Sequence, residues 1–288
     1  MPQVQEDASS NSTPRPSLQR NTLIAIVPIL LVLITFLFWY QTWFGRRLSD
    51  REMTECLTEA STPHKTQHAL AQLAERMTRG DATARRWYPQ VVTLAGSKES
   101  GLRLMAAWVM GQDNKSPEFH DVLRRLLDDP EPMVRRNAAL ALARFGDASG
   151  RAELQAMLRP FTLTAPQAGK LSFRLKDDDP VRNGGIVARL QSGDAKPVDV
   201  LSPVAGTLER RVAADGAQVA AGDAVAILSP GEEQVWESLR ALYLVGTPDD
   251  LEDVDRFARA VPSLSDRVRQ QAALTAAAIR QLAQNRIP

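Results

Sequence analysis

The first pattern along this chain is one long apolar run near its start. Residues 21–45 contain no charged side chain, and Leu23 through Tyr40 is almost wholly apolar. At about 1.5 Å per residue, roughly 18–22 helical residues cover about 27–33 Å, enough for the hydrocarbon core of a membrane. The run therefore predicts a transmembrane helix over residues 23–44.

The segments around this run support the same interpretation. Residues 1–22 are rich in Ser, Pro, Gln and Asn, so we expect a disordered tail. A cleaved signal peptide is the alternative, but the apolar run is too long and no small-residue cleavage site follows it. Two arginines precede the run and three follow it closely. That count slightly favours a cytoplasmic body, but long C-terminal domains can cross the membrane regardless, so it leaves the orientation open.

A helical pattern follows over residues 51–159 and returns over residues 232–285. Three of its segments end on a glycine, at Gly111, Gly146 and Gly246, and each has an alanine five positions earlier. We expect each glycine to end its helix in the left-handed conformation and each alanine to let a neighbouring helix approach closely. A second repeated pattern places a valine four residues before an alanine, at Val134 and Ala138 and again at Val268 and Ala272. This spacing predicts one buried helix face.

These repeated segments resemble one family. The stretch DDPEPMVRRNAALALARFGD, residues 128–147, is similar to HEAT repeats in the short form shared with phycobilisome-lyase-type repeats. The match is weaker for the helices expected around His68–Met77 and Ala84–Leu94. The resemblance implies an α-helical solenoid, whose curved face binds other proteins.

A third pattern, of alternating residues, interrupts the helical one between Pro160 and Pro230. It contains an internal duplication, in which residues 165–171 pair with 202–208 and residues 181–190 pair with 219–228. Asn183-Gly184 and Asp215-Gly216 are typical of hairpin turns. The duplication resembles the barrel-sandwich hybrid of biotinyl and lipoyl carrier domains, and the similar domain of membrane-fusion adaptor proteins. The resemblance implies a small all-β domain over residues 161–230.

Carrier domains attach their cofactor to a lysine in the link between the two halves. Here that link reads QSGDAKPVDV and contains Lys196, but in neither the lipoyl nor the biotin pattern. The adaptors carry a long helical hairpin at this place, and this link holds about ten residues. We therefore predict no bound cofactor and keep a carrier modified at Lys196 as the alternative.

The 100 residues between Gly146 and Gly246 equal one ordinary repeat plus this domain. We therefore predict that the domain is inserted inside a repeat, between a helix at Gly150–Arg159 and another at Glu232–Val245. Its two ends must then lie close together. Six branched side chains should point inward to form its own core: Val181, Val187, Leu190, Val219, Val225 and Leu228.

Composition and candidate chemistry narrow the function. The 35 basic and 34 acidic residues leave a net charge of +1, which argues against a nucleic-acid partner. A lone Cys56 excludes an internal disulfide. His64 and His68 could present two metal ligands on one helix, and Asp177–Asp179 could attract a cation, but we interpret both sets as surface residues and predict no metal site. No catalytic motif stands out, so we predict no enzyme.

The sequence thus predicts a protein-binding scaffold or adaptor that serves a transport or envelope complex. We expect it in a bacterial inner membrane, held by residues 23–44. The adaptor resemblance implies that the body faces the periplasm. Its partners would be proteins that bind the helical-repeat surface and the inserted domain. A phycobilin-lyase-like enzyme is a further option, which the repeat type alone favours.

Overall fold

The computed structural model describes residues 28–36, 47–58, 62–259 and 265–284 of the 288-residue chain. Two compact units divide it, residues 1–49 and residues 50–288. In the first unit, residues 28–36 are helical and carry exposed apolar side chains. The rest of the predicted membrane span, residues 23–44, lies outside the described residues. Among the residues that are described, no helix is both long and apolar enough to cross a membrane.

The second unit is mainly helical. Its helices are α2 (Asp50–Thr58), α3 (Pro63–Thr78), α4 (Tyr88–Leu94), α5 (Ser100–Met110), α6 (Pro117–Leu126), α7 (Pro132–Arg144), α8 (Arg151–Leu158), α9 (Glu232–Val245), α10 (Leu251–Ala258) and α11 (Asp266–Gln284). Short 3₁₀ turns precede three of them, at Ala82–Trp87, Ala148–Gly150 and Pro248–Asp250. Over the described residues, consecutive helices contact each other in five successive pairs: α2 with α3, α4 with α5, α6 with α7, α8 with α9, and α10 with α11.

Prolines and small polar residues set where these helices begin. α6 starts at Pro117. Proline has no backbone N–H, but an N–H in the first turn of a helix has no acceptor within the helix, so nothing is lost there. The Ser116 side chain accepts a hydrogen bond from the backbone N–H of Phe119 and caps the same helix. The helix expected over Ala84–Leu94 is divided into a 3₁₀ turn and α4, because Pro89 starts a new helix rather than continuing one.

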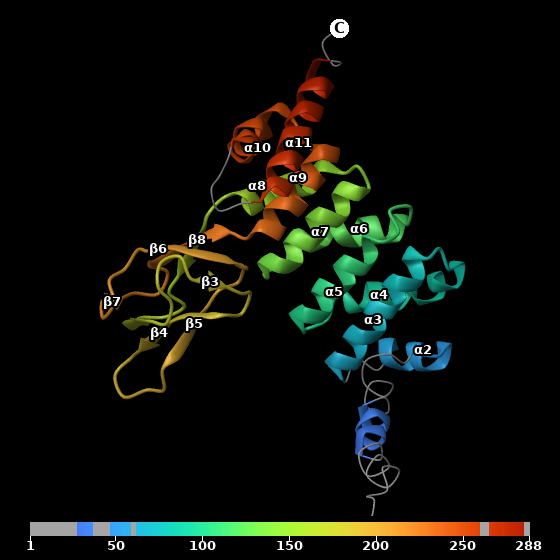
Figure 1. Cartoon of the computed structure of the whole chain (residues 1–288), viewed down its shortest axis with the longest axis horizontal. Helices are drawn as coiled ribbons and strands as arrows, with labels where there is room; N and C mark the ends of the chain where they lie inside the picture. The colour runs from blue at the N-terminus through green and yellow to red at the C-terminus, as the bar shows by residue number, and fades with distance from the viewer. Residues whose placement is uncertain (1–27, 37–46, 59–61, 260–264, 285–288) are drawn as a thin grey trace, which may run out of the picture. The chain divides into compact units, whose positions relative to one another are not determined.

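The second helices of the pairs stack on one another in one layer. α3 contacts α5, α5 contacts α7, α7 contacts α9, and α9 contacts α11 (Figure 1). We call α3, α5, α7, α9 and α11 the inner layer. The buried face that the sequence predicted is confirmed here, because Val134 and Ala138 of α7 and Val268 and Ala272 of α11 are all buried. Their small volumes let the helix axes approach closely.

The three repeat glycines do not all serve the same purpose. Gly146 has the expected left-handed φ of 75°, but Gly111 and Gly246 both have φ of −66°. The left-handed prediction is therefore wrong for these two. A Cβ on Gly111 would lie 3.0 Å from the Cβ of Ala141, and one on Gly246 would lie 2.7 Å from Cδ1 of Ile279. The next helix therefore lies close to both glycines, and at Gly246 a Cβ would also clash with the carbonyl oxygen of Leu242 in its own helix.

An arginine ladder joins successive pairs at their loops. Arg103 of α5 makes a bidentate pair with Asp129, through Nε to Oδ2 at 2.7 Å and Nη2 to Oδ1 at 2.9 Å. One pair further along, Arg135 of α7 pairs with Glu153 of α8 at 2.7 Å and donates to the carbonyl of Asp129 at 2.8 Å. Burial alone would raise the pKa of Asp129, but the hydrogen bonds from Arg103 and from the backbone of Glu131 outweigh it and hold that pKa below its usual range.

A small antiparallel sheet domain occupies the sequence between α8 and α9. Its strands are β1 (Phe161–Thr164), β2 (Gly169–Phe173), β3 (Pro180–Val181), β4 (Ile186–Gln191), β5 (Val198–Leu201), β6 (Gly206–Arg211), β7 (Gln218–Val219) and β8 (Ala224–Pro230). They form two four-stranded sheets, with the orders β1-β8-β6-β3 and β5-β4-β2-β7. Each sheet therefore combines strands from both copies of the duplicated sequence.

The two sheets are related by the duplication. Exchanging β1 with β5, β2 with β6, β3 with β7 and β4 with β8 converts one strand order into the other. Each copy also has a bulge at the equivalent residue, Val187 in β4 and Val225 in β8, and both side chains are fully buried. The repeated sequence thus builds a repeated structure, although β6 has a further bulge at Glu209 that β2 lacks.

The hairpin prediction for the two glycine turns is wrong. Gly184 and Gly216 do have positive φ, of 73° and 81°, as tight turns require. However, β3 and β4 belong to different sheets, and so do β6 and β7. The turns therefore carry the chain from one sheet to the other. Within the described chain, β4 and β5 are the consecutive strands that do pair with each other.

The domain has its own core. All six side chains expected to point inward are buried, which confirms that prediction. They form one apolar cluster, and the helices around α8 and α9 form another. Branched side chains from both sheets fill the space between them, as alternation along the strands predicts.

α8 and α9 pack against each other on either side of this domain. Leu154 and Leu158 of α8 and Leu239 of α9 share one buried cluster. Ser238 Oγ donates to the carbonyl of Leu154 at 2.7 Å, and Gln234 Nε2 donates to that of Met157 at 2.8 Å. The bond from Gln234 satisfies one of the last four carbonyls of α8, which have no partner within the helix.

The ends of the sheet domain meet at the same place. β1 and β8 pair antiparallel, with Phe161 opposite Leu228. Paired Cα atoms of such strands lie about 4.5–5.5 Å apart. The chain therefore enters and leaves the domain between two packed helices.

We predict that the helices fold without the sheet domain. Removing residues 161–230 and joining the ends by a short Gly/Ser linker should leave a helical protein, because the two cores are separate and α8 still packs on α9. Circular dichroism should show retained helix and a cooperative melt. Loss of both would mean that the sheet domain belongs to the main core.

We predict that Asp129 makes stability depend on pH. Its folded pKa is lowered, so its contribution is present above the ordinary aspartate value of about 3.9 and is lost as the pH falls through the folded pKa. Asp129→Asn should lower the free energy of unfolding at neutral pH by about 1.5–3 kcal/mol and flatten this acid limb. Denaturant titration at several pH values measures it. Asp121→Asn, on the exposed side of α6, is the control; an equal loss there would contradict the ladder.

Candidate functional site

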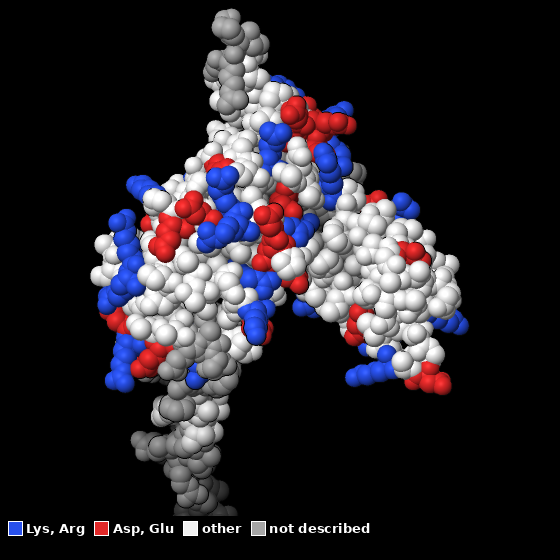
Figure 2. Space-filling view, turned by 180° about the vertical axis from the view of Figure 1, so that it is seen from behind, with Lys and Arg blue, Asp and Glu red and all other residues white. Residues whose placement is uncertain are grey.

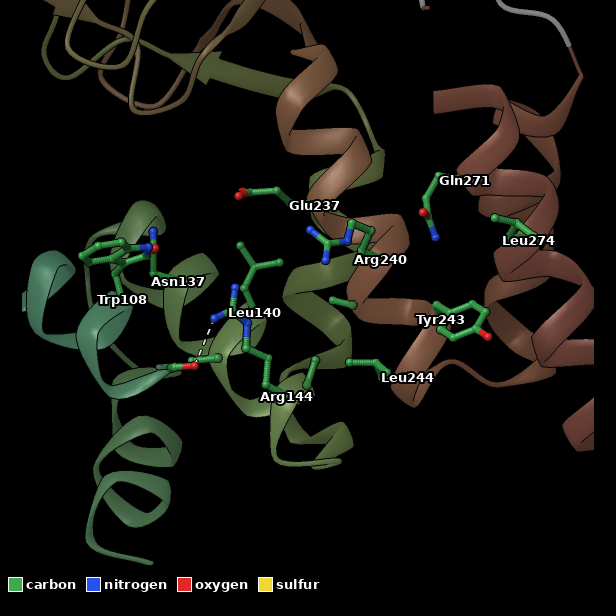
Figure 3. Close-up of a pocket in the computed structure, with 14 residues that line it drawn as sticks. Trp108, Asn137, Leu140, Arg144, Glu237, Arg240, Tyr243, Leu244, Gln271 and Leu274 are labelled. Atoms are coloured by element: carbon green, nitrogen blue, oxygen red, sulfur yellow. Dashed lines mark hydrogen bonds between the residues drawn. The ribbon is translucent and has the colours of Figure 1, made fainter. Parts of the chain in front are cut away.

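The candidate site is a groove on the exposed face of the inner layer. It has a volume of about 430 Å³. Side chains from α5, α7, α9 and α11 line it, so it runs across four successive helices (Figure 3). It thus belongs to the repeat architecture itself rather than to one loop.

Large apolar side chains stand exposed along this groove. Trp108 of α5 is 40% exposed, Tyr243 and Leu244 of α9 are 47% and 53% exposed, and Leu274 of α11 is 59% exposed. The half-buried Leu140 of α7 lies among them. Figure 3 shows Trp108 and Leu140 on one side of α9 and Leu274 on the other. Contiguous apolar exposure on a helical repeat is typical of a binding surface.

The sequence prediction did not find this groove. Counted back from the repeat glycines, position three holds Trp108, Ala143 and Tyr243. Trp108 and Tyr243 are exposed, but Ala143 is buried. Equal distance from the glycine therefore does not mean the same exposure, and this spacing does not mark the groove.

Arg240 is held in the groove without a carboxylate partner. Its guanidinium lies over the ring of Trp236, 4.5 Å from the centroid, and Arg267 stacks on the same ring at 4.2 Å. Arg267 also pairs with Glu233. Within the described part of the chain, Arg240 makes no ion pair. This cation–π contact holds the guanidinium against the ring without using its N–H donors.

Arg144 is the second cation of the groove. Its Nη1 donates to the carbonyl of Gly111 at 3.0 Å, across the gap between α7 and α5 (Figure 3), and lies 3.4 Å from Oε1 of Gln112. Both acceptors are neutral. Among the described residues it too has no carboxylate within ion-pair distance. Elsewhere in the helical region Arg103, Arg135 and Arg159 all reach carboxylates.

Glu237 is the one acid that lines the groove. Partial burial raises the pKa of its carboxyl, and the charge of Glu233 raises it further, while Arg144 and Arg240 oppose the shift. The residue as a whole stays exposed, so its carboxyl stands at the groove's edge. Figure 3 shows Glu237 and Arg240 extending from α9 on the side that faces α7.

Charge is otherwise mixed over the surface. Figure 2 shows basic and acidic side chains interspersed across the helical region on the face that it presents. The net charge of +1 agrees with this mixture. Around Arg144 and Arg240, the lining of the groove adds one acid, Glu237, and no further basic residue among the described residues.

Lys196 lies in the turn between β4 and β5, the place that the carrier resemblance implies. It is exposed, like all of residues 191–197. Gln191 Nε2 donates to the carbonyls of Gly193 and Ala195, and these bonds close the turn before Lys196. The lysine thus follows the turn tip and precedes Pro197. That placement does not fit a cofactor arm at the tip, so we derive no carrier chemistry from it.

The histidines are separated in the structure. His64 and His68 lie on α3 and are exposed, and His68 Nε2 is 2.8 Å from Gln72 Nε2. His120 of α6 is far along the repeat and pairs with Asp147 at 2.7 Å. Burial would raise the pKa of Asp147, but the hydrogen bonds from Ser149 and His120 hold it below its usual range.

The acidic turn at Asp177–Asp179 makes hydrogen bonds within the sheet domain. Asp177 Oδ1 accepts from the backbone N–H of Arg211 at 3.3 Å, and Asp215 Oδ1 accepts from that of Phe173 at 2.8 Å. The duplicated halves thus cap each other. Across the described residues there is no group of three or more His, Cys, Asp or Glu that could hold a metal. Cys56 is a free, partly buried thiol.

Comparison with known proteins gives a family match for part of the helical region. A family model described as HEAT repeats matches residues 88–160, from α4 to the end of α8. HEAT repeats are helical scaffolds for protein–protein interaction. No curated protein matches the chain.

Two solved structures resemble the chain only loosely. One is an engineered protein, with 18% identity and a TM-score of 0.43 over 81% of this chain and 80% of its own. The other is a single-chain, multi-domain long-chain acyl-CoA carboxylase, with 20% identity and a TM-score of 0.24. The match covers 44% of this chain and 14% of the carboxylase. Likeness this low carries no argument about function.

Proposed function

We propose that this protein is a binding scaffold rather than an enzyme, and that its inner-layer groove docks a segment of a partner protein. The observation that carries the proposal is the exposure of Trp108, Tyr243, Leu244 and Leu274 along one groove. Leaving large apolar side chains in water forgoes about 25 cal/mol for each Å² that burial would remove. A partner that covers the groove recovers that free energy.

The composition of the groove supports a protein partner. Binding energy at protein interfaces concentrates in Trp, Tyr and Arg side chains near the centre of the contact. Here Trp108, Tyr243, Arg144 and Arg240 line one groove. Stacked helices hold them rigidly, so little ordering entropy is lost on binding.

We further propose that the sheet domain is a barrel-sandwich hybrid like that of membrane-fusion adaptors, and that it offers a second contact to the same complex. The interleaved strand orders and the matching bulges at Val187 and Val225 support this. An inserted domain with its own core can present loops without disturbing the repeats. The scaffold would then serve a transport or envelope complex.

The membrane anchor belongs to the same proposal. Residues 23–44 would hold the chain in a bacterial inner membrane, with the body in the periplasm. The uncharged run from residue 21 to residue 45 supports the anchor. The exposed apolar side chains of helical residues 28–36 accord with it.

Site-specific crosslinking tests the docking groove. With p-benzoylphenylalanine in place of Tyr243, irradiation of cells should give one discrete adduct, and adding Leu274→Asp should reduce its yield several-fold. Arg125, exposed on α6 outside the groove, is the matched control position. Adducts from the control position alone, or none from either, would refute a docking role for the groove.

Reporter fusions test the anchor and its orientation. Alkaline phosphatase fused after residue 288 should be active, and the full chain should remain in membranes after alkaline carbonate extraction. Replacing Leu30 and Leu33 by arginine should release the chain, because each charge is costly in hydrocarbon. An inactive phosphatase together with a fluorescent cytoplasmic reporter would reverse the orientation.

A further inference from the structure

The groove holds two positioned cations, Arg144 and Arg240, that make no ion pair with a carboxylate in the described part of the chain. Arg240 is positioned by a tryptophan ring and Arg144 by a carbonyl and an amide oxygen. None of these groups is an anion. Each guanidinium therefore keeps unused N–H donors in a pre-set orientation, which is the arrangement that carboxylates bind best.

The groove's own acid does not neutralise this pair. No hydrogen bond or ion pair joins Glu237 to Arg144 or Arg240 in the described chain, although both lower its pKa. Burial and Glu233 raise that pKa more strongly. In its ionised form, however, Glu237 lies close enough to both arginines to repel a second carboxylate and compete for the same donors.

We propose that the partner segment is acidic as well as apolar, with one or more carboxylates that bind Arg240 and Arg144 between apolar side chains packed on Trp108, Tyr243 and Leu274. This rests on the proposed docking function of the groove and names its partner's chemistry. A basic segment would meet two unpaired cations and is selected against. The charges thus decide which apolar segment is accepted.

The length of the groove sets the length of the segment. Four stacked helices span three spacings of about 8–10 Å each, or about 24–30 Å. An extended chain rises about 3.3 Å per residue, so about eight residues cross the layer. A segment that crosses the layer in an extended conformation therefore needs about eight residues.

Three labelled peptides of eight residues test this preference. They share one frame of Leu and Ala, with two inner positions occupied by Glu, Gln or Lys. Fluorescence anisotropy with the full chain in mild detergent measures their affinities. The Glu peptide should bind about tenfold more tightly than the Gln peptide, and the Lys peptide more weakly than either.

Three variants assign the effect to the groove. Arg240→Gln should weaken the Glu peptide about tenfold and leave the Gln peptide almost unchanged. Glu237→Gln should tighten the Glu peptide several-fold, because a competing carboxylate is removed. Arg125→Gln on α6 should change neither, and unchanged thermal melting of all three excludes unfolding.

The outcomes separate the two proposals. Equal binding of the three peptides, or a Glu peptide insensitive to Arg240→Gln, would overturn the acidic preference while the crosslinking result for Tyr243 upheld docking. Failure of all three peptides to bind would overturn the acidic preference as well. Only the absence of a groove adduct in the crosslinking experiment would remove the docking function itself.

Discussion

The pairing of α8 with α9 is the contact on which the rest of this structure depends. The residues between them form a separate domain, so the two helices find each other only because the domain begins and ends at the same place. Antiparallel pairing of β1 with β8 supplies that closure. Ser238 and Gln234 then donate to carbonyls of α8. If this junction opened, the repeat would divide into two short stacks, neither with a complete core.

Closure of this junction also makes the groove. α9 contributes Glu237, Arg240, Tyr243 and Leu244, and it stands between α7 and α11 only because α8 holds it there. The inner layer therefore continues across the insertion without a break. A partner segment that lies across four helices reads residues from both sides of the inserted domain. The sheet domain is consequently inserted without interrupting the helical layer that carries the groove.

Within the inner layer, small residues allow close helix packing, and arginines supply hydrogen-bond donors. Gly111 and Gly246 admit the next helix at contact distance, and buried alanines keep the axes close. Rigid stacking then lets Trp236 hold the guanidinium of Arg240 by its face alone. A guanidinium held in this way has N–H donors left for a ligand. The N–H donors of Arg103 and Arg135 instead bind carboxylates that join successive repeats. The same residue type thus serves cohesion at the loops and recognition on the open face.

The sequence by itself determined the elements and their periodic faces. It predicted the helical repeats, the duplicated sheet domain between α8 and α9, and the inward side chains such as Val187 and Val225, because burial imposes local periods of 3.6 and 2 residues. It did not determine which turns cross between sheets, because Asn183-Gly184 requires positive φ whatever strand follows. Nor did it reveal that Ile279, 33 residues away, packs against Gly246. The groove depended on tertiary structure most of all: Trp108, Arg144, Arg240 and Leu274 lie on four helices, and only the stacking of those helices decides that they share a face.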